Sequence, residues 1–309
     1  MVSVQTVKEL RQKTGAGMMD CKNALKENNN DMEAAIDWLR TRGLAKAAKK
    51  AGRTAAEGLI GVAVEGNRGA IVEINAETDF VARNEQFQNM VTLVVQTALD
   101  TSSDTETLLG KTISQENTIV SDYVAGTAGS IGENISLRRS TSLAVKEGVV
   151  CSYIHNAVGD NLGRIGVLVA LESSGDKEQI SQIGRQIAMH IAAASPLALT
   201  IEDIDPSLVQ RERAILLAEA QESGKPEGVI EKMVEGRMRK FYQEVVLLSQ
   251  TFVIDNERTI EIFVKDAAKD CRAPITLTGF ARYALGEGLD IEPGKDFSTE
   301  VAEAVSGSR

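Results

Sequence analysis

An acidic residue and a large aromatic residue, Asp79 and Phe80, stand side by side where an apolar segment ends. Residues 71–74 have the apolar character of a strand, and a polar turn follows them. At the tip of such a turn, the pair could push a negative charge and a hydrophobic wedge into a partner together. Two structural roles compete with this one: Thr78 or Asp79 could cap the next helix, and Phe80 could pack back on it. From the residues alone, both interpretations stay open.

The two histidines give little support for catalysis. His190 falls on or beside the apolar stripe of a predicted helix, so a packed side chain is the expected role. His155 is expected in the exposed turn of a predicted hairpin, a place where functional residues are common. Neither belongs to a serine–histidine–acid order, an H-x-x-x-H pair or a G-x-S-x-G motif. The sequence predicts a protein that is not an enzyme, although a carboxylate site would leave little trace among 44 acidic residues.

Two glycine-containing segments imitate nucleotide-binding motifs. Residues 110–112 (GKT) match the end of a P-loop, but Thr105 stands where the first glycine is required, and no apolar strand precedes it. Gly15 and Gly17 follow a predicted helix, which is typical of a helix–helix turn and not of a dinucleotide fingerprint. No cofactor and no nucleotide pocket are expected on this chain.

The spacing of the cysteines and the hydropathy of the chain indicate the cellular compartment in which we expect the protein. Cys21, Cys151 and Cys271 lie more than a hundred residues apart and form no C-x-x-C pair, which argues against disulfides and against a zinc site. No apolar segment approaches the ~18 residues that a membrane span needs, and the N-terminus lacks the apolar region of a secretory signal. We therefore expect a cytoplasmic protein that contains no bound metal and does not enter a membrane.

Charge divides the chain into two parts. Residues 1–54 hold 11 Lys and Arg against 6 Asp and Glu, a balance of +5; the whole chain carries −10, so the remainder carries −15. A basic N-terminal segment could steer towards an acidic protein surface or towards nucleic acid. Aromatic residues are only 4% of the chain, and none interleaves with Lys46, Lys49, Lys50 and Arg53. Since proteins that stack on bases need such aromatics, direct nucleic-acid binding is not expected.

The elements that must position these residues follow from the spacing of apolar side chains. Helical spacing in residues 4–10, 18–25 and 32–39 predicts three short helices. A three-helix module this small exposes part of its apolar surface, so we expect it to dock on another surface. Residues 45–51 (AKAAKKA) then form a basic tail that leads into a linker.

A weak internal repeat predicts the core. Residues 57–60 (EGLI) and 147–150 (EGVV) each open a strand, and a second apolar strand follows at residues 69–75 and 163–171. An amphipathic helix comes next in each copy. The apolar stripes of these helices are Phe87, Met90, Val91, Val94 and Ala98 in the first copy and Ile180, Ile183, Ile187, Ile191 and Ala194 in the second. Two hairpin-plus-helix units predict an α+β fold built by duplication.

The rest of the chain predicts a helical insertion and a C-terminal end. A helical hairpin is expected over residues 207–249, with Ser207 as the cap of its first helix and Pro226 early in its second. Short strands are predicted at residues 251–254 and 274–283, and a terminal helix at residues 299–305. The predicted parts are a three-helix module (1–54), a core N-subdomain (55–145), a core C-subdomain (146–206 and 250–285), the hairpin (207–249) and a C-terminal module (286–309).

Six segments closely resemble the signatures of the bacterial elongation factor Ts family. They are residues 10–25 (LRQKTGAGMMDCKNAL), 73–84 (EINAETDFVARN), 131–134 (IGEN), 152–155 (SYIH), 163–169 (GRIGVLV) and 232–238 (KMVEGRM). They occur in the family's order and span nearly the whole chain. The resemblance implies a guanine-nucleotide exchange factor for elongation factor Tu, the GTPase that carries aminoacyl-tRNA to the ribosome. It also implies a ubiquitin-associated-like N-terminal module and a hairpin that serves dimerisation, so a homodimer is one expected state.

The resemblance implies roles for particular residues. Phe80 would wedge between side chains of the partner, and Asp79 would disturb the network that holds the partner's Mg²⁺. The implied surfaces are Thr78, Asp79, Phe80 and Val81 at the turn, Arg11, Met18, Met19 and Lys22 for N-terminal docking, and Ile131, His155, Val253 and Ile254 as further contacts. Residues 156–162 (NAVGDNL) depart from the family, because they lengthen the turn after His155.

One alternative stays open, a ribosome- or RNA-associated protein that binds through the basic N-terminal module. It predicts an affinity that falls steeply with salt. An exchange factor predicts instead nucleotide release that depends on Asp79 and Phe80. An enzyme would turn over a small substrate with no partner protein present.

Overall fold

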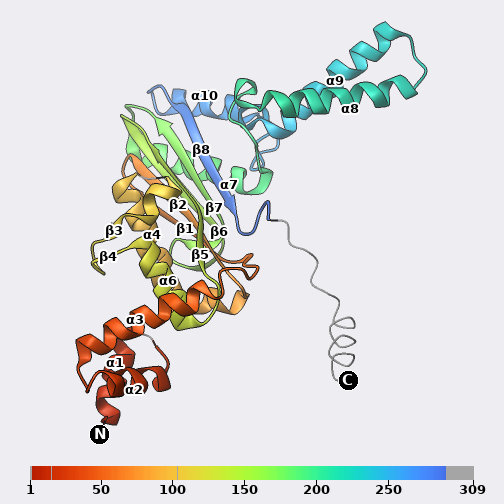
Figure 1. Cartoon of the computed structure of the whole chain (residues 1–309). Helices are drawn as coiled ribbons and strands as arrows, with labels where there is room; N and C mark the ends of the chain where they lie inside the picture. The colour runs from red at the N-terminus through yellow and green to blue at the C-terminus, as the bar shows by residue number, and fades with distance from the viewer. Residues whose placement is uncertain (1, 15, 103, 290–309) are drawn as a thin grey trace, which may run out of the picture.

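The computed structural model describes residues 2–14, 16–102 and 104–289 (Figure 1). At one end, the three predicted helices form the N-terminal module: α1 (Val4–Thr14), α2 (Met18–Glu27) and α3 (Met32–Ala48). Leu10, Cys21 and Leu25 are fully buried in it, so the apolar spacing does produce a small core. The predicted helix at residues 299–305 lies outside the described residues, as does most of the predicted C-terminal module.

Helix α3 carries the module onto α6 (Val120–Ile131). The two helices approach at glycines, since a Cβ at Gly129 would lie 2.4 Å from the Cα of Gly43. Arg40 also donates a hydrogen bond to Asp122 at 3.1 Å across this contact. The module is therefore packed on the core and not merely tethered to it.

Six strands form one hydrogen-bonded sheet within the described residues. They are β1 (Glu57–Glu65), β2 (Arg68–Ala76), β5 (Ser136–Ala144), β6 (Gly148–Gly159), β7 (Leu162–Glu172) and β8 (Thr276–Ala284). One half of the sheet is β5-β2-β1 and the other is β6-β7-β8, and the halves join where β1 pairs with the start of β7. Two short strands, β3 (Thr112–Ile113) and β4 (Thr118–Ile119), pair separately.

The two halves of the sheet pack face to face, and helices cover both outer faces. In β2, Ala70 and Val72 contribute to a hydrophobic cluster with α4 (Glu85–Thr101) and α6, whereas Ile71 lies in a second cluster between the halves. Strand β7 repeats this alternation, with Val167 packed against α7 (Lys177–Ala194) and Leu168 between the halves. Figure 1 shows α4 and α7 on opposite sides of the strands. The predicted α+β fold built by duplication is confirmed.

Matching glycines open the two hairpins. Gly58 in β1 has a φ of +128° and Gly148 in β6 has a φ of +139°. A Cβ would lie 2.1 Å from the carbonyl oxygen of Ile74 at the first position and 2.0 Å from that of Leu171 at the second. An L side chain cannot occupy either place unless the backbone moves. The duplication therefore extends to the backbone geometry of the hairpins.

The helical insertion consists of α8 (Pro206–Glu222) and α9 (Glu227–Val245), which project from the core as a hairpin (Figure 1). Its own small core contains Ala220, Val234 and Met238. The prediction that Ser207 caps the first helix is wrong. Asp205 caps it instead, because its side chain accepts the backbone N–H of Ser207 at 2.8 Å and Pro206 suits the first helical turn.

The predicted strand at residues 251–254 is also wrong. The segment is a turn with one isolated bridge, because Asp255 accepts the backbone N–H groups of Glu257 and Arg258 and folds the chain back. Helix α10 (Ile260–Asp270) follows. It was not predicted from the sequence, and it packs in the same cluster as α7. The predicted strand at residues 274–283 is confirmed as β8.

Candidate functional site

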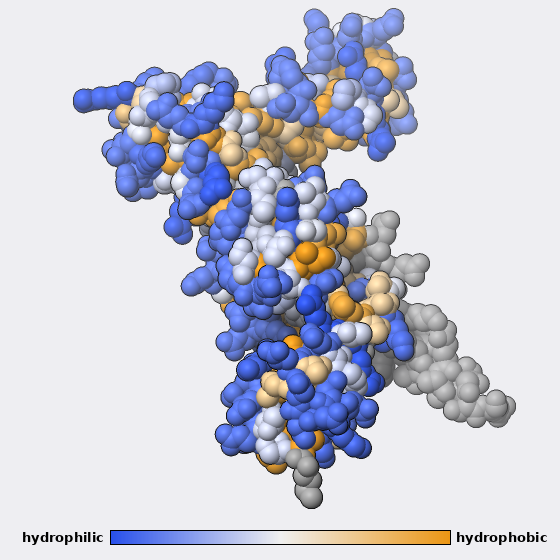
Figure 2. All heavy atoms as spheres, turned by 60° about the vertical axis from the view of Figure 1, so that its left-hand side comes forward, coloured by the Kyte–Doolittle hydropathy of each residue, from blue (hydrophilic) through white to orange (hydrophobic). Residues whose placement is uncertain are grey.

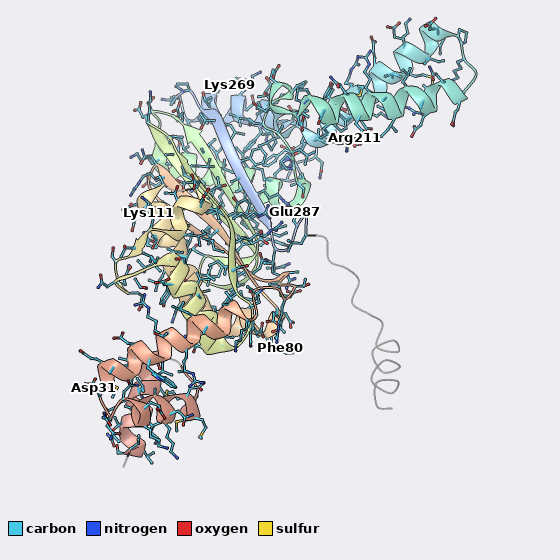
Figure 3. All side chains as sticks on the ribbon, in the orientation of Figure 1. Asp31, Phe80, Lys111, Arg211, Lys269 and Glu287 are labelled. Carbon is cyan, nitrogen blue, oxygen red and sulfur yellow. The ribbon has the colours of Figure 1, made fainter. Side chains whose placement is uncertain are left out.

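Asp79 and Phe80 lie at the tip of the connection from β2 to α4. A short 3-10 helix, Asp79–Arg83, forms this tip. Phe80 exposes 79% of its surface, more than any other large apolar side chain in the described part of the chain. Figure 3 labels it at the end of the core that lies towards the N-terminal module. A ring this exposed gains little from folding, so it is available to a partner.

Neither of the two structural roles considered for this segment exists in the structure. Asn84 caps α4, because its side chain accepts the backbone N–H of Phe87 at 3.1 Å. The side chain of Thr78 caps neither α4 nor the 3-10 helix. Phe80 does not pack back on α4, since most of its surface is exposed.

Two carboxylates hold the base of the tip. Glu133, in the loop after α6, accepts the backbone N–H of Thr78 at 3.0 Å and its hydroxyl at 2.7 Å. Glu77 accepts the backbone N–H of Asn134 at 2.6 Å. Burial opposes ionisation of Glu77, but the N–H of Asn134 and the Arg53 guanidinium outweigh it and lower the pKa of that carboxyl. Neither acid's role could be predicted from the sequence, because the bonded residues lie 55 and 57 positions apart and no spacing rule connects them.

Val81 was expected at the partner surface with its neighbours, but the structure buries it. It exposes only 4% of its surface and belongs to the hydrophobic cluster under α4. A 3-10 helix turns by about 120° per residue, so successive side chains point in different directions. Phe80 points outwards and Val81 inwards, and Val81 therefore anchors the tip instead of offering a contact.

The residues of the expected N-terminal docking surface are all exposed. Met18 and Met19 expose 40% and 65% of their surface at the start of α2, Lys22 lies one turn later, and Arg11 is on α1. Exposed methionines beside basic side chains suit a contact that buries adaptable apolar groups and also pairs charges. On the face shown in Figure 2, hydrophilic side chains otherwise cover most of this module, at the foot of the view.

His155 lies in a strand and not in a turn as expected. It belongs to β6 and pairs with Ile165 of β7, with its side chain exposed. The expected longer turn at residues 156–162 is wrong for the same reason. The two strands continue through most of that segment, a bulge near Ala157 absorbs the irregularity, and the turn itself is confined to residues 160–161.

Val253 and Ile254 stand in the turn before α10 and expose 40% and 49% of their surface. His190 holds this turn from inside the core, because its Nδ1 accepts the backbone N–H of Val253 at 3.3 Å. The neutral ring then carries its hydrogen on Nε2, which lies 2.9 Å from Gln250 Oε1. Burial lowers the pKa of His190, against the opposing effect of Gln250. The expected packed role of His190 is confirmed, since its exposure is 0%.

The expected site residues form separate surfaces and are not gathered in one pocket. Ile131 is half-buried at the end of α6, just before the loop that holds the tip. A cavity of about 230 Å³ lies elsewhere, between the N-terminal module and α6, where Trp38, Arg40 and Tyr123 are among its lining residues. No residue of the tip lines this cavity. Contacts dispersed in this way suit a large partner better than a small ligand.

The other candidates for chemistry have structural roles. The GKT segment leads from α5 (Thr105–Leu109) into β3, the reverse of the strand-to-helix order of a P-loop. The buried carboxylate of Glu73 accepts hydrogen bonds from Arg138 and Arg139, which neutralise it.

Within residues 2–14, 16–102 and 104–289, no three His, Cys, Asp or Glu side chains come together to hold a metal ion. In those same ranges, no helix combines the length and apolar character needed to cross a bilayer.

The comparisons with known proteins all match one family, over most of the chain. A protein-family model described as Elongation factor TS matches residues 77–287. Similar curated proteins, each named Elongation factor Ts, come from Parvibaculum lavamentivorans, Brucella anthropi and Rhizobium etli. They are 59%, 56% and 55% identical to this chain over 306 residues, which is 99% of this chain and 99% of each relative. The segment matched by the family model includes the tip, the loop after α6 and the helical hairpin.

Proposed function

Because this chain belongs to the elongation factor Ts family, we infer that it is a guanine-nucleotide exchange factor. It binds the GTPase elongation factor Tu and promotes the release of GDP, with its Mg²⁺, during translation elongation. The observation that carries this inference is the exposed ring of Phe80 beside Asp79, on a tip whose base is held by hydrogen bonds. The chain supplies binding energy and performs no chemical reaction of its own. We expect it to act in the cytoplasm, where translation takes place.

Exchange works through the coupling between two ligands of the same partner. A nucleotide bound with nanomolar affinity is held by about 12 kcal/mol. The exchange factor need not overcome this in one step, because each ligand weakens the binding of the other by the same coupling free energy. Burial of Phe80 would contribute about 1.5–3 kcal/mol. Several contacts are therefore needed, which fits the separate exposed surfaces of this chain.

In the proposed complex, the tip enters the nucleotide site of the partner. Phe80 wedges between partner side chains, Asp79 brings a negative charge close to the Mg²⁺, and Thr78 and Val81 hold the tip from behind. The remaining contacts are proposed for Arg11, Met18, Met19 and Lys22 on the N-terminal module and for Ile131, His155, Val253 and Ile254 on the core. A homodimer through α8 and α9 is proposed as well, and Ile215 and Val229 support it with exposures of 48% and 43% on the hairpin.

The alternative, a ribosome- or RNA-associated protein, is not favoured. The relatives described above all carry the name of an elongation factor. The basic module also lacks a free stacking platform at its one tryptophan, because Trp38 is half-buried and the guanidinium of Arg42 lies 4.6 Å from the centre of its ring. Stacking of bases needs an accessible aromatic face.

Release of a fluorescent GDP analogue from elongation factor Tu tests the proposed function. The native chain should accelerate release, and Phe80→Ala should lower that acceleration by roughly 10- to 100-fold, since each 1.4 kcal/mol is a factor of about ten. Asp79→Asn keeps the shape of the side chain but removes its charge, so its defect should grow as Mg²⁺ is raised. Val64→Ala is a matched control, because it truncates another exposed apolar side chain, 43% accessible, away from the tip.

The possible outcomes separate function from site. Absence of acceleration by the native chain would show that the proposed function is wrong. Equal acceleration by the native chain and by Phe80→Ala would leave the function in place and remove the proposed wedge. A loss in Val64→Ala as large as that in Phe80→Ala would show that the effect is not specific to the tip.

A further inference from the structure

The loop after α6 is anchored from the side of the N-terminal module. Lys50 donates a hydrogen bond to the carbonyl oxygen of Gly132, and the side chain of Asn134 donates one to the carbonyl oxygen of Arg53 at 2.7 Å. Lys50 and Arg53 belong to the segment that follows α3, which ends at Ala48. The residues on both sides of Glu133 are thus held by the segment that connects the module to the core.

Glu133 holds one residue of the tip through two atoms. Its Oε2 accepts the backbone N–H of Thr78 at 3.0 Å, and its Oε1 accepts the hydroxyl of the same residue at 2.7 Å. The first bond sets the direction of the backbone immediately before Asp79, and the second fixes the side chain. Hydrogen bonds to an ionised carboxylate are strong and directional. A second contact runs in the opposite sense, since the N–H of Asn134 donates to Glu77.

The outer part of the tip has no comparable restraint. Phe80 exposes 79% of its surface and so makes few contacts that could orient it. The next firm anchor along the chain is Val81, in the hydrophobic cluster under α4. Between the end of β2 and Val81, Glu77 accepts hydrogen bonds from Asn134 and Arg53, and Thr78 donates two to Glu133; the bonds of Glu133 are the ones made to the residue directly before Asp79.

We propose that Glu133 is a positioning residue for nucleotide exchange, which preorganises Asp79 and Phe80 for entry into the nucleotide site of the partner. This inference rests on the proposed function and adds a residue that does not touch the partner's nucleotide. A tip already held in its bound direction loses less freedom when it binds. The same loop is hydrogen-bonded to Lys50 and Arg53, in the segment that connects the N-terminal module to the core. The position of the module and the direction of the tip therefore depend on one loop.

Glu133→Gln tests the proposal, because the amide keeps the size of the side chain but offers one acceptor oxygen to two donors of Thr78. GDP release from elongation factor Tu is measured over a range of exchange-factor concentrations. The maximal rate should fall about tenfold, because fewer bound complexes hold the tip in its productive direction. The half-saturating concentration should change by less than about twofold, because the docking surfaces are intact.

A second variant and a control keep the test independent of folding. Thr78→Val removes the hydroxyl with little change in shape, and the Thr78→Val/Glu133→Gln double variant should be no slower than the slower single variant, because both act through one contact. Glu65→Gln is the matched control, since Glu65 is another acid in an ion pair, with Arg68, but lies exposed at a hairpin turn. Thermal unfolding of each variant measures the folded fraction.

Each possible outcome supports or overturns the proposed role of Glu133. Equal maximal rates for the native chain and Glu133→Gln overturn the inference, as does an effect confined to the half-saturating concentration. A lower rate fully explained by a smaller folded fraction, or fully additive effects in the double variant, also overturns it. A native chain without exchange activity overturns the proposed function as well, so the two failures are distinguishable.

Discussion

The duplicated core contains two strand-to-helix connections of different length, and the longer one carries the exposed tip. After β7 the chain reaches α7 through residues 173–176, whereas after β2 it reaches α4 only through residues 77–84. Both helices begin alike, since Asp176 caps α7 as Asn84 caps α4, each by accepting a backbone N–H. The shorter connection shows that the fold closes without the additional residues. The exposed part of the longer connection, which includes Phe80, is therefore not needed to close the fold.

The short connection is packed on its neighbours, and the long one is packed on one side only. Ser173 is buried, and a Cβ on Gly175 would lie 2.9 Å from the Cβ of Ala273. In the long connection, Val81 is buried while Phe80 is exposed. The tip thus has an inner face that the core constrains and an outer face that is free for a partner, so mutations should separate stability from exchange.

Replacement of the paired glycines should have the largest effect on stability. Gly58→Ala and Gly148→Ala each force a Cβ towards a carbonyl oxygen, at 2.1 and 2.0 Å. Each should lower the free energy of unfolding by about 4 kcal/mol or more, and by similar amounts, because the positions correspond. Chemical denaturation measures the change. In contrast, Gly236→Ala within α9 has no neighbour near its Cβ and should be neutral or stabilising by about 0.5–1 kcal/mol.

If alanine were tolerated at one of the two glycines but not at the other, the proposed correspondence between the two hairpins would be wrong. It would mean that the hairpins do not share the backbone geometry on which the correspondence of the two connections depends. Equal and large losses would support that correspondence.

Truncation of a buried and of an exposed side chain of the tip should affect different properties, stability in one case and exchange in the other. Val81→Ala removes buried methyl groups and should lower the free energy of unfolding by about 2 kcal/mol. Phe80→Ala removes an exposed ring and should change that free energy by no more than about 0.5 kcal/mol, although it impairs exchange. Denaturation and GDP release are measured on the same preparations. A Phe80→Ala variant as unstable as Val81→Ala would show that the ring packs on the core after all.

The smallest expected effect is a pH dependence confined to the second half of the core. His190 lies as far after the cap of α7 as Ala98 lies after the cap of α4, so only one half carries a titrating group here. Burial lowers the pKa of His190 below its ordinary value of about 6.5, and the unfolded chain therefore binds the proton first as pH falls. The free energy of unfolding should fall below about pH 6.5, by at most about 1.4 kcal/mol per pH unit, until the folded-state pKa is reached.

Denaturation between about pH 7.5 and about pH 5.5, above the range of most carboxylates, measures this effect. His190→Gln should remove most of the decline. The chain has two histidines, so His155→Gln, at an exposed position, is the natural control and should leave the decline in place. A decline that persists in His190→Gln would assign the pH dependence to another group.

Local rules predicted most of the elements and failed where two rules competed. The stripes through Phe87 and Ile187 predicted the two long helices because burial follows a period of 3.6 residues. Ser207 and Asp205 are both good caps beside one proline, and only the geometry chose between them. Residues 251–254 have the apolar character of a strand, but the polar turn at Asp255 outweighs it. His155 was misplaced because the polar segment after it is typical of a turn, whereas β6 continues to Gly159.

The fold class, the family and the place of Asp79 and Phe80 after an apolar strand could be predicted from the sequence, because periodicity and motifs depend on residues close together in the chain. Tertiary packing, in contrast, is what leaves Phe80 facing solvent while Val81 enters the core. It alone also brought Glu133 to Thr78, across 55 positions, and divided the expected contacts among separate surfaces. Exposure and long-range hydrogen bonds depend on how whole elements pack together, and spacing along the chain does not encode that packing.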